Sequence, residues 1–142
     1  MVYKHLYEVF EQAAKEKTVK AKEQFLKDNN SLALRDFVKG AYDPKVTFNW
    51  IPKGPIPFEK AKVEDLTSSL LHKTSEFPKI SDNGPGSAMK QIDKERTLIT
   101  LMETIHPKDA DLVSLMLTDK FKGKYKGITV KLCTKVWPKL FL

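Results

Sequence analysis

Apolar side chains recur at intervals of three and four residues along much of the chain, and this period restricts it to a helical fold. Within residues 2–15, Leu6, Val9, Phe10 and Ala13 share one side of a helix, with charged residues opposite. The same period predicts helices at residues 19–27, 32–41, 63–72, 88–105, 108–119 and 130–136. We therefore predict an all-α domain with about six or seven helices.

Capping residues mark where several of these helices begin. Serine and threonine side chains accept hydrogen bonds from the free N–H groups of a first helical turn. Such residues precede four of the predicted helices: Thr18, Ser31, Ser87 and Thr129. At the junction of two helices His106 is followed by Pro107, which suits the first position of the second helix. We therefore expect a structural role for His106.

Prolines exclude a continuous helix from residues 43–58, where they occupy positions 44, 52, 55 and 57. We expect an extended segment that lies across helices and could include a short strand at residues 46–50. Phe48 and Trp50 either line a binding groove or pack onto the core, and packing is the commoner fate of such aromatic residues.

Two shorter stretches are also predicted to be non-helical. Residues 77–80 are expected to form a linker, and residues 81–87 a flexible surface loop, because the latter are rich in glycine, serine and asparagine. The glycines there do not match a phosphate-binding loop, since no Gly-Lys-Ser/Thr string follows them.

A chain of 142 residues is long enough to fold as one domain without a metal or a disulfide. We divide it into a helical subdomain at residues 1–42, a proline-rich extended segment at 43–62, helices over 63–119, and a basic turn with a C-terminal helix over 120–142. No apolar run reaches the ~20 residues of a membrane span, and the first residues show no secretory pattern. The single cysteine suits a reducing cytoplasm.

The net charge of +7 is confined to residues 120–142. This segment holds seven of the 25 basic side chains and none of the 18 acidic ones, so the rest of the chain is balanced. The seven are Lys120, Lys122, Lys124, Lys126, Lys131, Lys135 and Lys139. Such asymmetry indicates a polyanionic partner. A solvated lysine loop that caps an ordinary helix explains the charge equally well.

The arrangement of this segment is typical of a phosphate-binding site. A turn of glycine and lysine at residues 122–127 precedes Thr129 and the helix predicted at 130–136, which Pro138 ends. Glycine lets backbone N–H groups approach a ligand, and the start of a helix adds partial positive charge. Arginine is rare in the chain, and lysine acts as a point charge that attracts phosphate without reading base edges.

Residues that commonly carry catalysis are scarce. The three histidines lie far apart in the sequence, which suggests no metal site. Cys133 falls on the inner side of the last predicted helix without a neighbouring histidine, so we expect a buried, inert thiol. Asp109 and Asp111 occupy a first helical turn, where negative charge is favoured anyway. No nucleophile–base pair stands out, and we expect neither catalysis nor a cofactor.

Two blocks of the sequence carry a resemblance to a known family. The first, residues 6–42, contains Phe-Leu-Lys-Asp-Asn-Asn at 25–30 and Leu-Arg-Asp-Phe-Val at 34–38. The second, residues 109–140, contains its most specific string, Lys-Val-Trp-Pro, at 135–138. Together they resemble the N-terminal helical DNA-binding domain of ATP-dependent DNA ligases, most closely that of T-even phages. The chain is also similar to small phage-encoded proteins.

This resemblance implies that the chain binds duplex DNA through the phosphate backbone, with little sequence specificity. By resemblance, the phosphate contacts are Lys124, Lys126, Gly127, Thr129 and Lys131. The charge of the segment adds Lys120, Lys122 and Lys135. The Lys-x-Asp-Gly string that holds the adenylated lysine of ligases does not occur, so nick joining is not expected. The resemblance implies a non-catalytic accessory protein in the cytoplasm of a phage-infected bacterium.

The apolar tail allows a second interpretation. The chain ends in Trp-Pro-Lys-Leu-Phe-Leu, and such a tail resembles peptides that dock into sliding clamps. Leu140, Phe141 and Leu142 would then bind a clamp, or another replication or host protein, and the chain would be an adaptor or inhibitor. Alternatively, Trp137 and the residues after it fold back onto the core, which we favour for Trp137.

Overall fold

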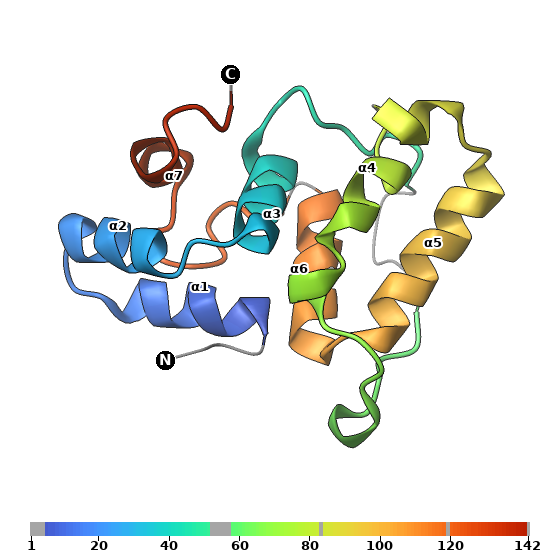
Figure 1. Ribbon diagram of the computed structural model, residues 1–142, viewed down its shortest axis with the longest axis horizontal. Coiled ribbons are helices and arrows are strands. Elements are labelled where there is room, and N and C mark those ends of the chain that lie inside the picture. Colours follow the sequence, from blue (N-terminus) through green and yellow to red (C-terminus); the bar gives the residue numbers. More distant parts are fainter. Residues whose placement is uncertain (1–4, 52–57, 83, 119, 142) are drawn as a thin grey trace.

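The computed structural model describes residues 5–51, 58–82, 84–118 and 120–141, and over these residues it is helical without a strand (Figure 1). The α-helices are α1 (Leu6–Lys15), α2 (Val19–Asp28), α3 (Leu32–Tyr42), α4 (Phe77–Ile80), α5 (Gln91–Thr104), α6 (Pro107–Leu117) and α7 (Val130–Val136). The 3₁₀ turns are η1 (Val63–Asp65), η2 (Leu70–His72), η3 (Thr74–Glu76) and η4 (Gly84–Ala88). The prediction of an all-α fold is confirmed. No helix in the described ranges has the length and apolarity that a membrane span requires.

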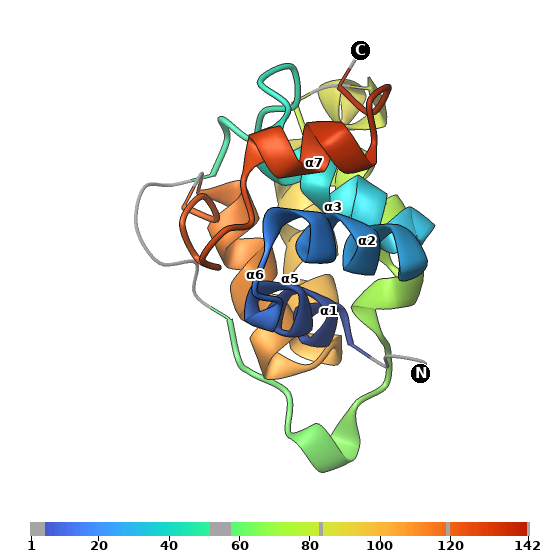
Figure 2. The ribbon, with the colours of Figure 1, turned by 90° about the vertical axis from the view of Figure 1, so that its left-hand side faces the viewer.

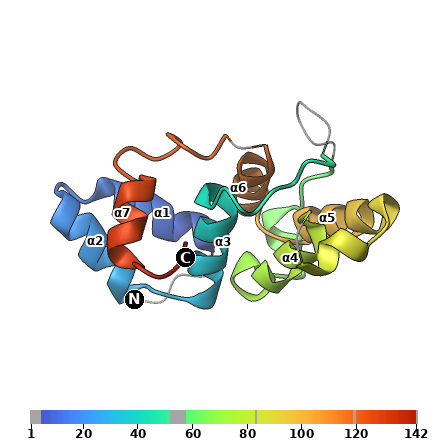
Figure 3. The ribbon, with the colours of Figure 1, turned by 90° about the horizontal axis from the view of Figure 1, so that it is seen from above.

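Helices α3 and α6 pack together in the middle of the molecule. Helices α1, α2 and α7 lie on one side of this pair, and α4 and α5 lie on the other (Figures 1 and 3). Helix α2 packs against both α1 and α7, and α5 packs against α6. The segment after α6 therefore has to cross from the middle of the molecule to the outer helix α7.

Local capping sets the helix starts largely as predicted. Thr18 accepts a hydrogen bond from the N–H of Ala21 at 3.0 Å, and Ser31 accepts one from Leu34 at 3.1 Å. The Nδ1 atom of His106 accepts from the N–H of Lys108 at 3.1 Å and caps α6. The predicted structural role of His106 is thus confirmed. Residues 2–4 of the first predicted helix lie outside the described ranges.

The helix predicted at residues 63–72 is wrong. The 3₁₀ turns η1 and η2 stand there instead, joined by non-helical residues. The N–H of Ser68, between the two turns, donates to the carbonyl of Thr104 at 3.1 Å, so the backbone there pairs with the end of α5 rather than within a helix. Val63, at the start of this stretch, is 58% exposed.

The predicted linker and loop over residues 77–87 are also wrong in part. Residues 77–80 form the short helix α4, in which Phe77 and Ile80 are buried. Helix α5 begins at Gln91 without a side-chain cap, so Ser87 does not start it. The backbone of Gly86 packs so closely on the carbonyl of Ser81 that a Cβ atom would overlap with it. This close approach bends the chain into η4 and delays the start of α5.

Residues 43–51 form a largely extended segment with turns at 44–45 and 49–50 and no strand. The N–H of Asp82 donates to the carbonyl of Thr47 at 2.8 Å, and side chains add further contacts. The carboxylate of Asp82 accepts from the hydroxyl of Thr47 at 2.8 Å and from the N–H of Asn49 at 2.6 Å. The indole N–H of Trp50 donates to the carbonyl of Ile80 at 2.6 Å.

The aromatic side chains of this segment pack inward, as favoured above. Phe48 is 8% exposed and belongs to the core, and Trp50 packs against the core from outside. Lys94 of α5 is buried, with its Nζ 5.9 Å from the centre of the Trp50 ring. A cation held over an indole ring is stabilised by the ring's negative face.

Asp109 joins α6 to the start of α1. Its side chain is fully buried, and its two carboxylate oxygens accept from the N–H groups of Tyr7 at 2.7 Å and Leu6 at 3.2 Å. A carboxylate at this place satisfies free donors of the first turn and complements the positive end of the helix. Burial raises the pKa of Asp109 to about 6, although the two backbone hydrogen bonds act in the opposite direction.

We expect Asp109 to make stability depend on pH. Its folded-state pKa of about 6 lies above the ~3.9 of an unfolded aspartate, so folding favours the protonated form. Its contribution is therefore present at pH 4 and is lost as the pH rises through 6. The free energy of unfolding of the native protein minus that of the Asp109→Asn variant should be about 2 kcal/mol larger at pH 4 than at pH 7. Urea titrations at both pH values measure this difference.

The matched control is Asp111→Asn, because Asp111 is exposed on the same helix. Its difference from the native protein should change by less than about 0.5 kcal/mol between the two pH values. If the difference in free energy of unfolding between the native protein and Asp109→Asn is the same at pH 4 and pH 7, burial does not raise the pKa of this carboxyl group.

Candidate nucleic-acid interface

The basic turn after α6 is fastened to the core by side chains that alternate with its lysines. Phe121 and Ile128 are each 2% exposed, and Tyr125 is half-buried, whereas the lysines between them are exposed. The ring of Phe121 lies with its centre 5.2 Å from that of Phe10 and 5.0 Å from that of Phe37. The apolar residues therefore point the neighbouring lysines outward. This alternation is visible in the sequence at residues 121, 125 and 128, between the lysines.

Two tyrosines complete the attachment. The hydroxyl of Tyr42 donates to the carbonyl of Ile128 at 3.2 Å. The ring of Tyr125 stacks on Phe10 with centres 5.7 Å apart. Burial raises the pKa of Tyr125 to about 12 and that of Tyr42 further still, so both hydroxyls keep their protons at neutral pH.

Glycines shape the turn at two positions. Gly123 and Gly127 have φ angles of 84° and 79°, which favour glycine. A Cβ atom on Gly123 would meet nothing within 4 Å, so the conformation alone calls for glycine there. On Gly127 a Cβ atom would lie 2.5 Å from Cε of Lys22. The space beside Gly127, which we expected to serve a ligand, is thus occupied by this lysine.

Lys22 is a buried residue that sequence reasoning missed. It is 9% exposed, and its ammonium donates to the carbonyl of Ala14 at 3.3 Å and to that of Glu16. These carbonyls lie at the end of α1, where a positive charge is favourable. Nothing in the sequence distinguishes Lys22 from the exposed lysines around it.

All the predicted contact residues are exposed: Lys120, Lys122, Lys124, Lys126, Gly127, Thr129, Lys131 and Lys135. The first six lie on the segment that runs along one edge of the molecule from α6 to α7, and the last two lie on α7 itself (Figure 3). Lys131 and Lys135, four residues apart on α7, share one face of that helix. Elsewhere in the described ranges, Lys27, Lys60, Lys79 and Lys108 form ion pairs with carboxylates.

The start of α7 adds less to this surface than the lysines do. Thr129 caps the helix by accepting from the N–H of Leu132 at 3.2 Å, as predicted. A helix end carries at most about half an elementary charge, whereas each lysine carries a full one. Helix α7 has only seven residues, and its end adds less charge than a single lysine does. The positive charge of this edge therefore comes mainly from lysine side chains.

A groove of about 660 Å³ borders the beginning of the turn. Its walls are the end of α3, the extended segment over residues 43–51 and the end of α6, and Lys120 and Lys122 line it. The basic edge, by which we mean the exposed lysines of residues 120–135, is therefore hollowed at the end near α6.

The apolar tail folds back onto the domain. Trp137 is 8% exposed, and its indole N–H donates to the side-chain oxygen of Asn30 at 3.0 Å, which confirms the favoured interpretation for this residue. Leu140 and Phe141 are partly buried against the core, and the carbonyl of Phe141 accepts from Lys45 at 3.1 Å. Leu142 lies outside the described residues. Docking of this tail into a clamp would first require these contacts to break.

The side chains that could in principle act in catalysis or bind a metal have structural roles or are buried. Cys133 is fully buried, as predicted, and burial raises its pKa to about 12. His5 and His106, distant in sequence, lie with ring centres 4.6 Å apart. Burial lowers the pKa of His106, which suits its role as an acceptor in the cap. Within the described ranges no group of three or more metal-ligating side chains occurs.

Comparisons with known proteins give one match. A family described as a family of unknown function (DUF6433) matches residues 9–123. No curated protein and no solved structure shows significant similarity to the chain. The matched range includes Lys120 and Lys122, and the rest of the basic segment follows it.

We expect Phe121→Ala to destabilise the domain strongly, because it removes a buried ring that contacts the rings of Phe10, Phe37, Tyr42 and Tyr125. Truncation of a buried phenylalanine typically costs ~3–5 kcal/mol. The free energy of unfolding from urea titration measures the effect. The control is Val130→Ala in the same segment, where the side chain is 46% exposed and the change should stay within about 0.5 kcal/mol. Equal effects of the two substitutions would mean that Phe121 does not anchor the turn.

Proposed function

Since the chain belongs to the DUF6433 family, whose function is unknown, its role must be inferred from its surface, and we propose that it binds duplex DNA through the phosphate backbone. The observation that carries the proposal is the basic edge. All the excess positive charge of the chain lies in residues 120–142, and the lysines of this segment are exposed. Clustered cations of this kind attract the closely spaced phosphates of a duplex.

The chemistry of the edge favours backbone contacts over base reading. Lysine ammonium groups neutralise phosphates but lack the planar fork with which arginine recognises guanine. Binding should therefore depend strongly on salt and weakly on sequence.

The aromatic residues of the segment favour a duplex over a single strand. Proteins that hold single strands usually stack bases on exposed aromatic rings. Here Phe121 is buried and Tyr125 is stacked on Phe10, so neither ring offers a free face of this kind.

The resemblance to the DNA-binding domain of DNA ligases supports the same surface, because in that family the turn before the last helix lies at the DNA. The Lys-x-Asp-Gly string of ligases does not occur in the chain. We therefore propose a non-catalytic accessory role, in keeping with the similarity to small phage-encoded proteins.

The salt dependence of DNA binding tests the proposal. If four lysines of residues 120–142 contact phosphates, they should contribute about −3.6 to the slope of the logarithm of the binding constant against the logarithm of salt concentration, from ~−0.9 per phosphate. The double variant Lys124→Ala/Lys126→Ala should flatten this slope by about two. Fluorescence anisotropy with a labelled duplex, measured over a range of salt concentrations, gives both slopes.

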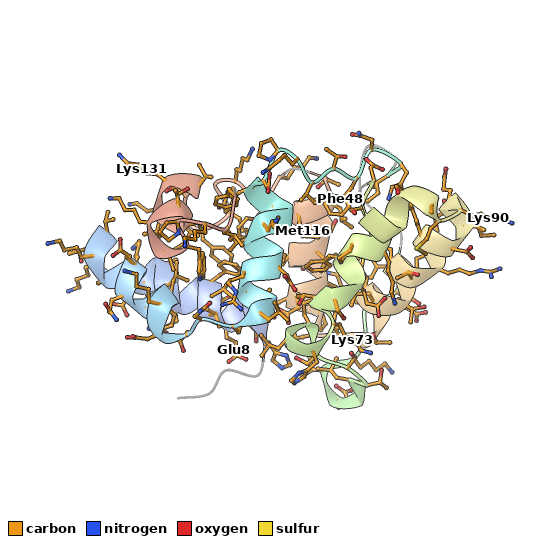
Figure 4. All side chains as sticks on the ribbon, turned by 45° about the horizontal axis from the view of Figure 1, so that its top comes forward. Glu8, Phe48, Lys73, Lys90, Met116 and Lys131 are labelled. Atoms are coloured by element: carbon orange, nitrogen blue, oxygen red, sulfur yellow. The ribbon has the colours of Figure 1, made fainter. Side chains whose placement is uncertain are left out.

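The matched control is Lys73→Ala/Lys90→Ala, which removes the same charge. In Figure 4, Lys73 and Lys90 lie away from Lys131, with Lys90 at the opposite end of the molecule. This control should leave the slope within about 0.5 of the native value. Absence of duplex binding at low salt, or equal slopes for both double variants, would overturn the proposal. Tighter binding to a single strand of equal length would reject the choice of a duplex.

A further inference from the structure

Lys22 connects the basic turn to a second part of the surface. Its ammonium holds the carbonyls of Ala14 and Glu16, at the end of α1. The methylene next to that ammonium fills the space beside Gly127. The connection between α1 and α2 and the end of the basic turn therefore lie against the same side chain. In Figure 2 the connection runs beside the segment that leads into α7.

This connection carries lysines of its own. Lys15 and Lys17 flank Glu16, and both lysines are exposed. The ion pairs seen in the described part of the chain involve neither lysine. The connection therefore presents net positive charge next to the basic turn, although residues 1–119 as a whole are balanced.

The attachment between the two segments is well defined. A buried ammonium is costly unless its hydrogen bonds are satisfied, and the two carbonyls of α1 supply acceptors. The packing under Gly127 excludes any larger residue at that position without a shift of Lys22. Both loops are thus held at a fixed separation by one side chain.

We infer that Lys15 and Lys17 form a second arm of the nucleic-acid surface, and that they contact the phosphate backbone of the same duplex as the basic turn. This inference rests on the proposed function and extends it to a part of the chain whose net charge gave no indication of it.

The double variant Lys15→Ala/Lys17→Ala tests the inference in the full chain with a labelled duplex. If each lysine contacts one phosphate, the salt slope should flatten by about two. At 0.1 M salt, affinity should fall by roughly one to two orders of magnitude. Both side chains are exposed, so the free energy of unfolding should stay within about 0.5 kcal/mol of the native value.

The control Lys73→Ala/Lys90→Ala removes the same charge far from both arms and accounts for the change in net charge. Suppose that Lys15→Ala/Lys17→Ala gives the same salt slope as that control, while Lys124→Ala/Lys126→Ala still flattens it. This result would overturn the inference of a second arm and leave the proposed function intact. Flattening by both arm variants, with a near-additive effect when the four substitutions are combined, would support it. If neither arm variant differs from the control, the proposed function fails together with the inference.

Discussion

The contact of Phe121 with Phe10 and Phe37 is the constraint on which the arrangement of the domain depends. The three rings come from α1, α3 and the segment after α6, and their centres lie 5.0 to 5.4 Å apart. This distance suits tilted aromatic pairs, which contribute beyond their buried area. Because Phe121 occupies the core immediately after α6, the lysines on both sides of it must face solvent. The exposure of the basic edge is thus a consequence of core packing.

Attachment of the turn also bears on the proposed binding of DNA. A flexible lysine loop would lose conformational entropy on meeting a phosphate backbone, and this loss would weaken the complex. Here Phe121, Tyr125 and Ile128 hold the turn to the core at three points, and Thr129 fixes the start of α7. The backbone between the lysines is therefore ordered before any ligand arrives. The remaining cost is confined to the lysine side chains.

The helices that could be predicted are those whose ends are set locally. The period of apolar residues and the caps Thr18, Ser31 and Thr129 defined α2, α3 and α7 nearly to the residue. Prediction failed over residues 63–88, where the backbone is held by distant groups such as the carbonyl of Thr104. The lysines of the candidate interface could be found from charge alone. Phe121, Tyr125 and Ile128 alternate with these lysines in the sequence, but their role as anchors depends on core residues that are distant in the chain.

Lys22 and Asp109 show why other features of the fold could not be predicted from local sequence patterns. Both are buried charged residues that look like surface residues in sequence, and both act on α1 from other helices. Asp109 of α6 binds the N–H groups at the start of α1, and Lys22 of α2 binds the carbonyls at its end. Each charge complements the partial charge of the helix end that it meets. Helix α1 is thereby held along its axis, which fixes Phe10 against Phe121. The position of the basic turn thus depends on two buried charged side chains.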